Sequence, residues 1–191
     1  MHVYLETERL VLRQFTESDA DNLFDLDGDP EVMRYLTGGA GTPRDVIRDI
    51  VLPAFLRSYE GLDGFGVWAA IEKASGDFVG WFGFRPRLGS DTREVELGYR
   101  LRRASWGCGY ATEGARALIR KGFAELGVQR VVATTYQDNV ASRRVMEKAG
   151  MTLVRTFRMS PADLLAKDTI HVASPELWDG DDVEYALERA D

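Results

Sequence analysis

The sequence has 191 residues, of which 45% are hydrophobic and 29% charged, a composition typical of an ordinary globular protein and unlike a disordered or fibrous one. This length is ample for a buried core but short for two substantial domains, so we expect one domain over residues 1–191. The formal net charge of −7 argues against binding to nucleic acid and is compatible with an amine-bearing substrate.

The cysteine and histidine content excludes two kinds of site. Cys108 is the sole cysteine, so no intrachain disulfide can form, which fits a reducing compartment. His2 and His171 are too isolated for a dedicated zinc site, and no metal is expected. Residues 1–8 lack a secretory signal pattern and no apolar run reaches the length of a membrane span. We therefore expect a cytoplasmic protein that does not bind membranes.

The first part of the chain contains the pattern of one strand followed by the start signals of two helices. Residues 9–15 alternate charged and apolar positions, as a strand does. Thr16 followed by Asp19 resembles a capping pair and predicts a helix that begins there. Asp29 before Pro30 predicts the start of a second, short helix.

A third helix is expected where apolar residues keep helical spacing over residues 46–55. Thr42 caps its start with Pro43 at the first helical position, whereas Pro53 lies inside the pattern and should kink or split it. The glycine-rich residues 37–43 lack the lysine of a nucleotide-binding P-loop, so we expect them to form a mobile loop near the substrate.

Strands dominate the middle of the chain. Residues 65–71, 78–84 and 94–101 are predicted to form an antiparallel meander, with turn residues between them. The β-branched residues 130–136 predict another strand, which follows an amphipathic helix that ends at Gly127. The strand, the helix and the next strand should form a parallel, right-handed unit.

A last helix and two strands complete the expected fold. The helix covers roughly residues 139–149, and the strands lie near residues 152–159 and 182–187. The polar residues 160–181 between the strands are not assigned. The whole is predicted to be an α/β domain in which about four helices flank a mixed sheet of about seven strands.

The most informative feature is a pair of segments that each open a helix. Residues 106–113 read Trp-Gly-Cys-Gly-Tyr-Ala-Thr-Glu, and their small residues let the backbone pass close to a ligand. The helix that follows presents unpaired N–H groups and a positive dipole end, which suit a phosphate. Asn139 and Ser142 place an amide and a hydroxyl on the first turn of another helix. Together the segments suggest a phosphate-anchored cofactor with chemistry beside it.

The order of elements and these two segments resemble the GNAT superfamily of acyl-CoA N-acetyltransferases. The second segment reads Asn-x-x-Ser-x-x-Val-x-x-Lys-x-Gly over residues 139–150. Both segments are similar to those of the ribosomal-protein N-terminal acetyltransferases, the RimJ/RimL-like branch. In that branch the position of Trp106 is usually tryptophan, whereas the wider family has Gln or Arg there. The likeness begins at residues 6–10, covers about residues 6–159, and is loose beyond them.

The resemblance implies acetyl-CoA as co-substrate. In GNAT enzymes acetyl-CoA enters between two strands that splay apart, here residues 94–101 and 130–136, with its pyrophosphate on the start of the helix between them. Asn139 is expected to bond the pantetheine arm, although it also suits a helix N-cap. The residues expected to bind the co-substrate are Leu101, Arg102, Arg103, Trp106, Gly107, Cys108, Gly109, Tyr110, Ala111, Thr112, Asn139 and Ser142.

Direct acetyl transfer to an amine needs a base, a polarised carbonyl and help for the departing thiolate. The resemblance implies that a backbone N–H near Leu101 or Arg102 holds the carbonyl oxygen. Glu96 is the candidate base, directly or through water, and a solvated strand carboxylate is its alternative role. The resemblance points to Ser142 beside the CoA sulfur, and Tyr136 at its strand end is a second candidate. A thiol pKa of about 8.5 means that a hydrogen bond can suffice.

Several alternatives stay open at this level. The acceptor is either a protein N-terminal amine or a small-molecule amine. A non-catalytic acyl-CoA-binding regulatory protein is the alternative to an enzyme. Arg102 and Arg103 suit CoA phosphates, yet strand alternation makes at least one of them a surface charge. The protein acts either as a monomer or as a homodimer.

Overall fold

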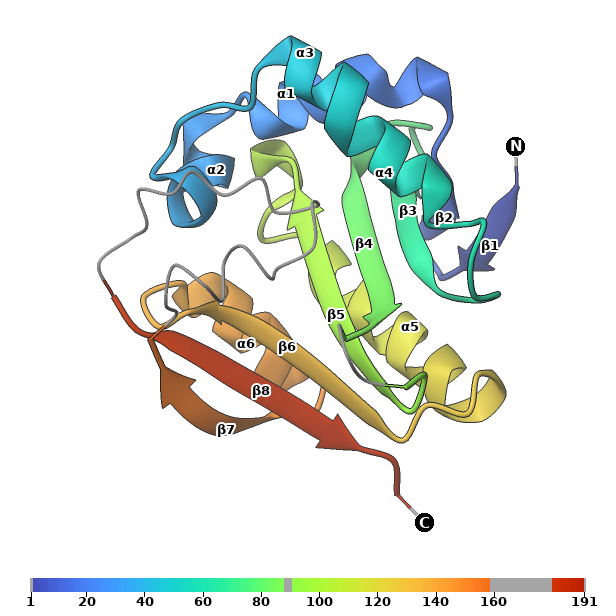
Figure 1. Ribbon diagram of the computed structural model, residues 1–191, viewed down its shortest axis with the longest axis vertical. Helices are drawn as coiled ribbons and strands as arrows, with labels where there is room; N and C mark the ends of the chain where they lie inside the picture. Colours follow the sequence, from blue (N-terminus) through green and yellow to red (C-terminus); the bar gives the residue numbers. More distant parts are fainter. Residues whose placement is uncertain (1, 88–90, 159–179, 191) are drawn as a thin grey trace.

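The computed structural model describes residues 2–87, 91–158 and 180–190 and contains one mixed sheet (Figure 1). The sheet has eight strands in the order β1-β2-β3-β4-β5-β6-β8-β7. The strands are β1 Val3–Glu6, β2 Leu10–Gln14, β3 Gly66–Glu72, β4 Phe78–Pro86, β5 Glu94–Leu101, β6 Arg130–Tyr136, β7 Thr152–Phe157 and β8 Asp182–Glu188. Every neighbouring pair is antiparallel except β5 and β6, which are parallel as predicted.

The strand that exceeds the expected seven is β1. It has 4 residues, too few to show a convincing alternation in the sequence. Pairing with β2 and the ring of Tyr4 hold it in place, since this ring stacks on Trp68 with centroids 3.9 Å apart. A contact between residues so far apart in the chain leaves no local signal.

The described helices also exceed the expected number of about four. They are α1 Ala20–Asp27, α2 Pro30–Thr37, α3 Arg44–Val46, α4 Leu52–Arg57, α5 Tyr110–Glu125 and α6 Val140–Lys148. A π-helical turn, Ile47–Val51, joins α3 and α4 into one segment just before Pro53, so the helix is interrupted as the proline predicts. The short α2 forms separately because the Asp29 side chain caps its start and Gly38 ends it in a left-handed conformation.

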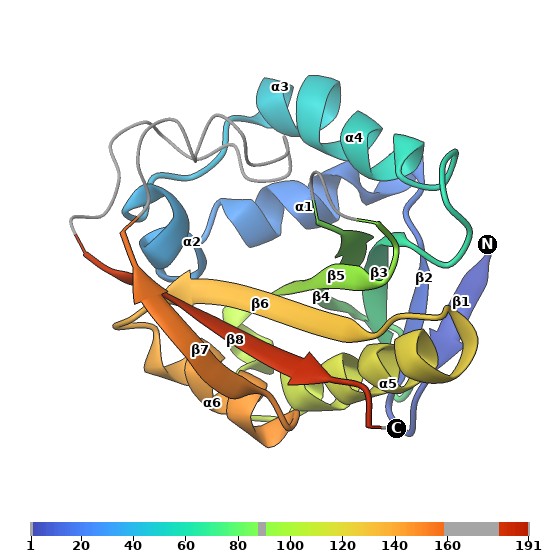
Figure 2. The same ribbon diagram turned by 60° about the horizontal axis from the view of Figure 1, so that its bottom comes forward.

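Helices cover both faces of the sheet (Figures 1 and 2). Leu118 and Ile119 of α5 and Met146 of α6 belong to one buried cluster with apolar residues of β2 to β6 and β8. Leu23 of α1 and Phe55 of α4 belong to a second cluster on the opposite face. No helix in the described ranges is long and apolar enough to span a membrane.

The two parallel strands separate along their length. β5 pairs with β6 only from Glu94 to Glu96, opposite Arg130–Val132. Beyond this point β6 continues to pair with β8 on its other side, whereas β5 continues to Leu101 without β6. The expected splay is therefore present. Most of the unassigned segment 160–181 and the end of the strand expected at 152–159 lie outside the described residues.

Candidate active site

Backbone donors line the β5 side of the splay. The N–H of Arg102 donates to the carbonyl of Val79 at 2.9 Å, so it faces β4. Backbone groups alternate in direction along a regular strand, and the N–H groups of Tyr99 and Leu101 therefore point toward β6. Pairing with β6 has already ended at Glu96. The geometry favours Tyr99 and Leu101 over Arg102 as donors into the splay.

The end of β5 is held closely from two sides. Gly80 of β4 has φ 142°, and a Cβ there would collide with the Arg100 carbonyl and lie 2.7 Å from the Leu101 Cα. The indole N–H of Trp106 donates to the Leu101 carbonyl at 2.8 Å. Trp106, expected at the co-substrate, thus also fixes the strand that ends beside it.

The glycine loop presents a row of unpaired backbone donors. Gly107 and Gly109 have φ values of 75° and 84°, and a Cβ on Gly107 would meet no atom within 4 Å. The first helical hydrogen bond of α5 runs from Glu113 N–H to the Gly109 carbonyl at 3.0 Å. The N–H groups of residues 107–112 have no acceptor within the described part of the chain. These donors at a helix start fit a pyrophosphate, so the residues present suit CoA.

The arginines at the end of β5 pair with polar side chains of the opposite helices. Arg100 is 9% exposed and forms a buried ion pair with Asp27 at 2.5 Å. The partners of the other two are Asn22 and Asp25 for Arg102 and Asp29 for Arg103. These pairs hold α1 and the start of α2 against the strand end.

The carboxylate of Glu96 lies where the two strands begin to separate. It accepts a hydrogen bond from Thr134 Oγ1 of β6 at 3.2 Å. A strand advances by about 3.3 Å per residue, so Glu96 is about 10 Å from Tyr99 and about 17 Å from Leu101 along β5. At this separation the Glu96 carboxylate is too far from the end of β5 to contact a group bound there directly.

The start of α6 brings Asn139 and Ser142 to the splay. Asn139 Oδ1 accepts from the Ser142 N–H at 3.2 Å, the N-cap bond that was its alternative role, and its Nδ2 donates to Thr135 Oγ1 at 3.1 Å. Ser142 Oγ lies 3.0 Å from the hydroxyl of Tyr99, which also donates to the Ser142 carbonyl at 3.1 Å. Tyr99 therefore connects β5 to α6.

Two tyrosines near the splay remain protonated at neutral pH. Burial raises the pKa of Tyr99 to about 12, although its hydrogen bond to Ser142 acts in the opposite direction. Burial and then the charge of Asp182 raise the pKa of Tyr136. Sequence reasoning found Tyr136 but missed Tyr99. Strand alternation places Tyr99 on the face opposite Glu96, but no signal in the sequence points to its contact with Ser142.

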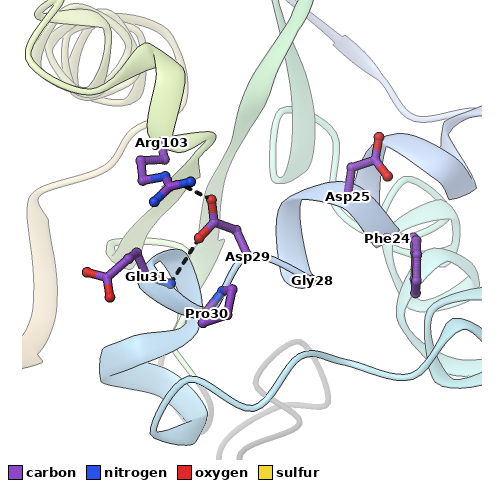
Figure 3. Close-up of a pocket in the computed structure, with 7 residues that line it drawn as sticks. All are labelled: Phe24, Asp25, Gly28, Asp29, Pro30, Glu31 and Arg103. Carbon is purple, nitrogen blue, oxygen red and sulfur yellow. Dashed lines mark hydrogen bonds and ion pairs between the residues drawn. The ribbon is translucent and has the colours of Figure 1, made fainter.

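A hollow of about 630 Å³ lies between the end of α1, the start of α2 and the residues after β5 (Figure 3). It is lined by Phe24, Asp25, Gly28, Asp29, Pro30, Glu31 and Arg103. Asp29 joins two of its walls, because its carboxylate pairs with Arg103 at 3.2 Å and accepts from the Glu31 N–H at 2.9 Å. Nearby, the hydroxyl of Tyr35 on α2 donates to the Asp138 carbonyl at 3.2 Å, which ties α2 to the turn before α6. The hollow is predominantly acidic.

A family model described as an acetyltransferase (GNAT) domain matches residues 9–152. The chain belongs to this GNAT family. It is accordingly an acyl-CoA-dependent N-acetyltransferase with acetyl-CoA as co-substrate, as the resemblance predicts. Among the residues with described positions, no group of three or more His, Cys, Asp or Glu could hold a metal ion.

Known proteins resemble this GNAT enzyme over most of its length. The FsC-acetyl coenzyme A-N(2)-transacetylase of Aspergillus fumigatus is 36% identical over 159 residues, which cover 80% of this chain and 66% of that protein. The chain thus spans just under two thirds of the fungal relative. A solved GNAT-family acetyltransferase from Bacillus anthracis has a TM-score of 0.75 and 26% identity, with 99% of each chain covered.

One solved relative bears on the expected branch. A RimL ribosomal L7/L12 alpha-N-protein acetyltransferase with coenzyme A has a TM-score of 0.74 and 18% identity, with 98% of each chain covered. At this identity the likeness shows the shared fold alone. The GNAT family is therefore established, and the assignment to the ribosomal-protein branch is not part of that finding.

Proposed function

We propose that the enzyme transfers acetyl from acetyl-CoA to a primary amine by direct attack within a ternary complex. The observation that carries this proposal is the row of unpaired N–H groups at residues 107–112 beside the splay of β5 and β6. The row of N–H groups suits the phosphates of acetyl-CoA, and the splay of the two strands suits its extended pantetheine arm. In this proposal residues 1–191 act as a single cytoplasmic domain, alone or as a homodimer.

Backbone groups hold the two ends of the donor in this proposal. The N–H groups of Gly107 to Thr112, including that of Cys108, bind the pyrophosphate, with Trp106 directly before them, and Asn139 bonds the pantetheine arm. The N–H of Leu101 or Tyr99 holds the thioester carbonyl, because that of Arg102 already donates to Val79. One such donor can contribute roughly a hundredfold or more to the rate.

In this proposal, side chains beside the splay accept the proton of the amine and donate a hydrogen bond to the departing sulfur. Glu96 accepts the proton of the attacking amine through water, supported by its hydrogen bond from Thr134. The amine nitrogen forms a bond to the carbonyl carbon as the carbon–sulfur bond breaks. Ser142 Oγ donates a hydrogen bond to the departing sulfur, and Tyr99 orients that hydroxyl by turning its own proton from the Ser142 carbonyl to Ser142 Oγ. Tyr136, protonated at neutral pH, is the alternative donor.

The acidic hollow supports an acceptor that carries positive charge before it reacts. Asp25, Asp29 and Glu31 outnumber Arg103 in its lining, and it adjoins the end of β5 where the thioester would lie. The fungal relative is named an FsC-acetyl coenzyme A-N(2)-transacetylase, which supports a nitrogen as the acceptor atom, and the acidic lining suits a small amine. The Trp106 and Asn139 segments favour the ribosomal-protein branch and hence a peptide N-terminus.

The test is release of free CoA from acetyl-CoA with a panel of peptides and small amines. We expect at least one primary amine to drive release that saturates with both substrates. Intersecting initial-rate patterns would support a ternary complex, and parallel ones would contradict it. Tight CoA binding without turnover by any acceptor would favour the non-catalytic acyl-CoA-binding protein instead.

A further inference from the structure

The opening segment of the chain contacts the glycine loop directly. Glu113, at the end of the glycine segment, accepts from Thr7 Oγ1 at 2.6 Å and from the Arg9 N–H at 2.9 Å. The guanidinium of Arg9 donates through Nε to Glu113 Oε2 at 2.7 Å and through Nη1 to the Cys108 carbonyl at 2.9 Å. Residues 7–9 and the glycine loop, which are far apart in the sequence, are thus held together by hydrogen bonds.

The contact is well defined on both sides. Glu113 is 17% exposed and Arg9 44% exposed. Burial opposes ionisation of Glu113, but hydrogen bonds from Thr7 and from the backbone and side chain of Arg9 outweigh it and lower its pKa. The guanidinium also lies 4.6 Å from the centre of the Tyr110 ring. Arg9 is therefore held in one orientation against the loop.

This orientation fixes a peptide plane in the loop. In a trans peptide the carbonyl oxygen and the following N–H point in opposite directions. When Arg9 holds the Cys108 carbonyl, the N–H of Gly109 must point away from Arg9. Gly109, with its positive φ, otherwise allows this plane to rotate, because glycine accepts many backbone conformations.

We propose that Arg9, held by Glu113, is a positioning residue that directs the Gly109 N–H toward the CoA pyrophosphate. This inference rests on the proposed CoA site. Arg9 acts on the loop and touches neither the thioester nor the acceptor. Its effect is therefore confined to ligands that carry the phosphates.

The test compares CoA with pantetheine, which lacks the pyrophosphate. In Arg9→Gln we expect CoA to bind about tenfold more weakly by calorimetry, the cost of a lost charge-assisted hydrogen bond. Pantetheine binding, followed by NMR titration, should not change. Arg116→Gln is the matched control, because Arg116 of α5 donates to the distant Lys148 carbonyl and its loss should leave CoA binding intact.

Further variants separate positioning from direct charge attraction. Glu113→Gln should also weaken CoA binding, since it loosens Arg9. Tighter binding in this variant would mean that Arg9 acts as a charge on the phosphate and would overturn the proposal. Equal CoA binding in Arg9→Gln and wild type, or equal losses for CoA and pantetheine, would overturn it as well.

Two further controls complete the design. Arg9→Lys replaces Arg9→Gln if the latter does not fold, because an ammonium group keeps the charge but lacks the planar fork that joins Glu113 to Cys108. It should again weaken CoA binding and spare pantetheine, and unchanged CoA binding would overturn the proposal. Absence of CoA binding to the wild type would instead refute the CoA site itself.

Discussion

The hydroxyl of Tyr99 lies 3.0 Å from Ser142 Oγ and joins β5 to the first turn of α6 across the splay. Tyr99 cannot shed its proton at neutral pH, because burial raises its pKa to about 12. It therefore acts as a neutral partner that fixes where the serine hydroxyl points. The contributions of Tyr99 and Ser142 to turnover can therefore be separated by mutating each residue alone and both together.

Tyr99→Phe should lower kcat while the fold persists. The ring remains packed, but Ser142 loses the partner of its hydroxyl, and one hydrogen bond of this kind contributes about 1 kcal/mol, or roughly fivefold in rate. The control is Tyr4→Phe, which removes a tyrosine hydroxyl bonded to the Gly64 carbonyl. Unchanged kcat in Tyr99→Phe, measured at saturating acetyl-CoA and acceptor, would contradict the orienting role.

Ser142→Ala should lower kcat more than Tyr99→Phe does. It removes the hydroxyl expected at the departing sulfur, where a hydrogen bond to developing charge contributes roughly tenfold to a hundredfold in rate. Ser58→Ala, which removes a hydroxyl bonded to the Phe55 carbonyl, is the control. Adding Tyr99→Phe to Ser142→Ala should cost little more, because the tyrosine acts through the serine. Full turnover by Ser142→Ala would remove this residue from the mechanism and leave Tyr136 as the candidate.

Glu96→Gln should reduce kcat by about a hundredfold or more, as expected when a positioned base is lost. CoA binding should stay the same, because Glu96 is remote from the glycine loop along β5. The control is Glu94→Gln, two residues earlier on the same face, whose carboxylate pairs with Arg130. A pH–rate profile identical to that of the wild type would show that Glu96 is a solvated strand carboxylate.

Those parts of the fold and of the site that depend on residues close together in the sequence could be predicted from it. The parallel unit and the loop at residues 107–112 follow from local patterns of glycine, caps and alternation. Tyr99 is 43 residues from Ser142, and Arg9 is 104 residues from Glu113, so no local pattern marks either pair. The strand β1 was missed for the same reason, since Tyr4 depends on the distant Trp68.

Gly80→Ala should impair both stability and turnover. A Cβ at this position meets the Arg100 carbonyl and the Leu101 Cα, both in the backbone, so β5 must shift at its end. Gly76→Ala is the control, because Gly76 also has positive φ but a Cβ there meets nothing within 4 Å, and left-handed strain alone costs about 1 kcal/mol. Chemical denaturation and kcat should both show the larger loss for Gly80→Ala. Equal losses in the two variants would mean that the approach of β4 to β5 is not critical.

Asp19→Asn should destabilise the fold by about 3 kcal/mol at neutral pH, because it leaves Arg13 without its charged partner. The two side chains form a double hydrogen bond, with both distances 2.7 Å, and Asp19 is 2% exposed.

Burial opposes ionisation of Asp19, but hydrogen bonds from Arg13 and Thr16 outweigh it and lower its pKa. The folded pKa then lies below the unfolded value of about 3.9, so this stabilisation is complete above that pH and is lost as the pH falls through the folded pKa. Urea unfolding of the wild type from pH 7 to pH 3 should show the onset of this loss below about pH 4, and Asp19→Asn should show less of it. The exposed pair of Arg48 and Asp49 provides the control, since Asp49→Asn should leave the unfolding curve unchanged. A wild-type acid limb that persists in full in Asp19→Asn would assign the pH dependence to other carboxylates.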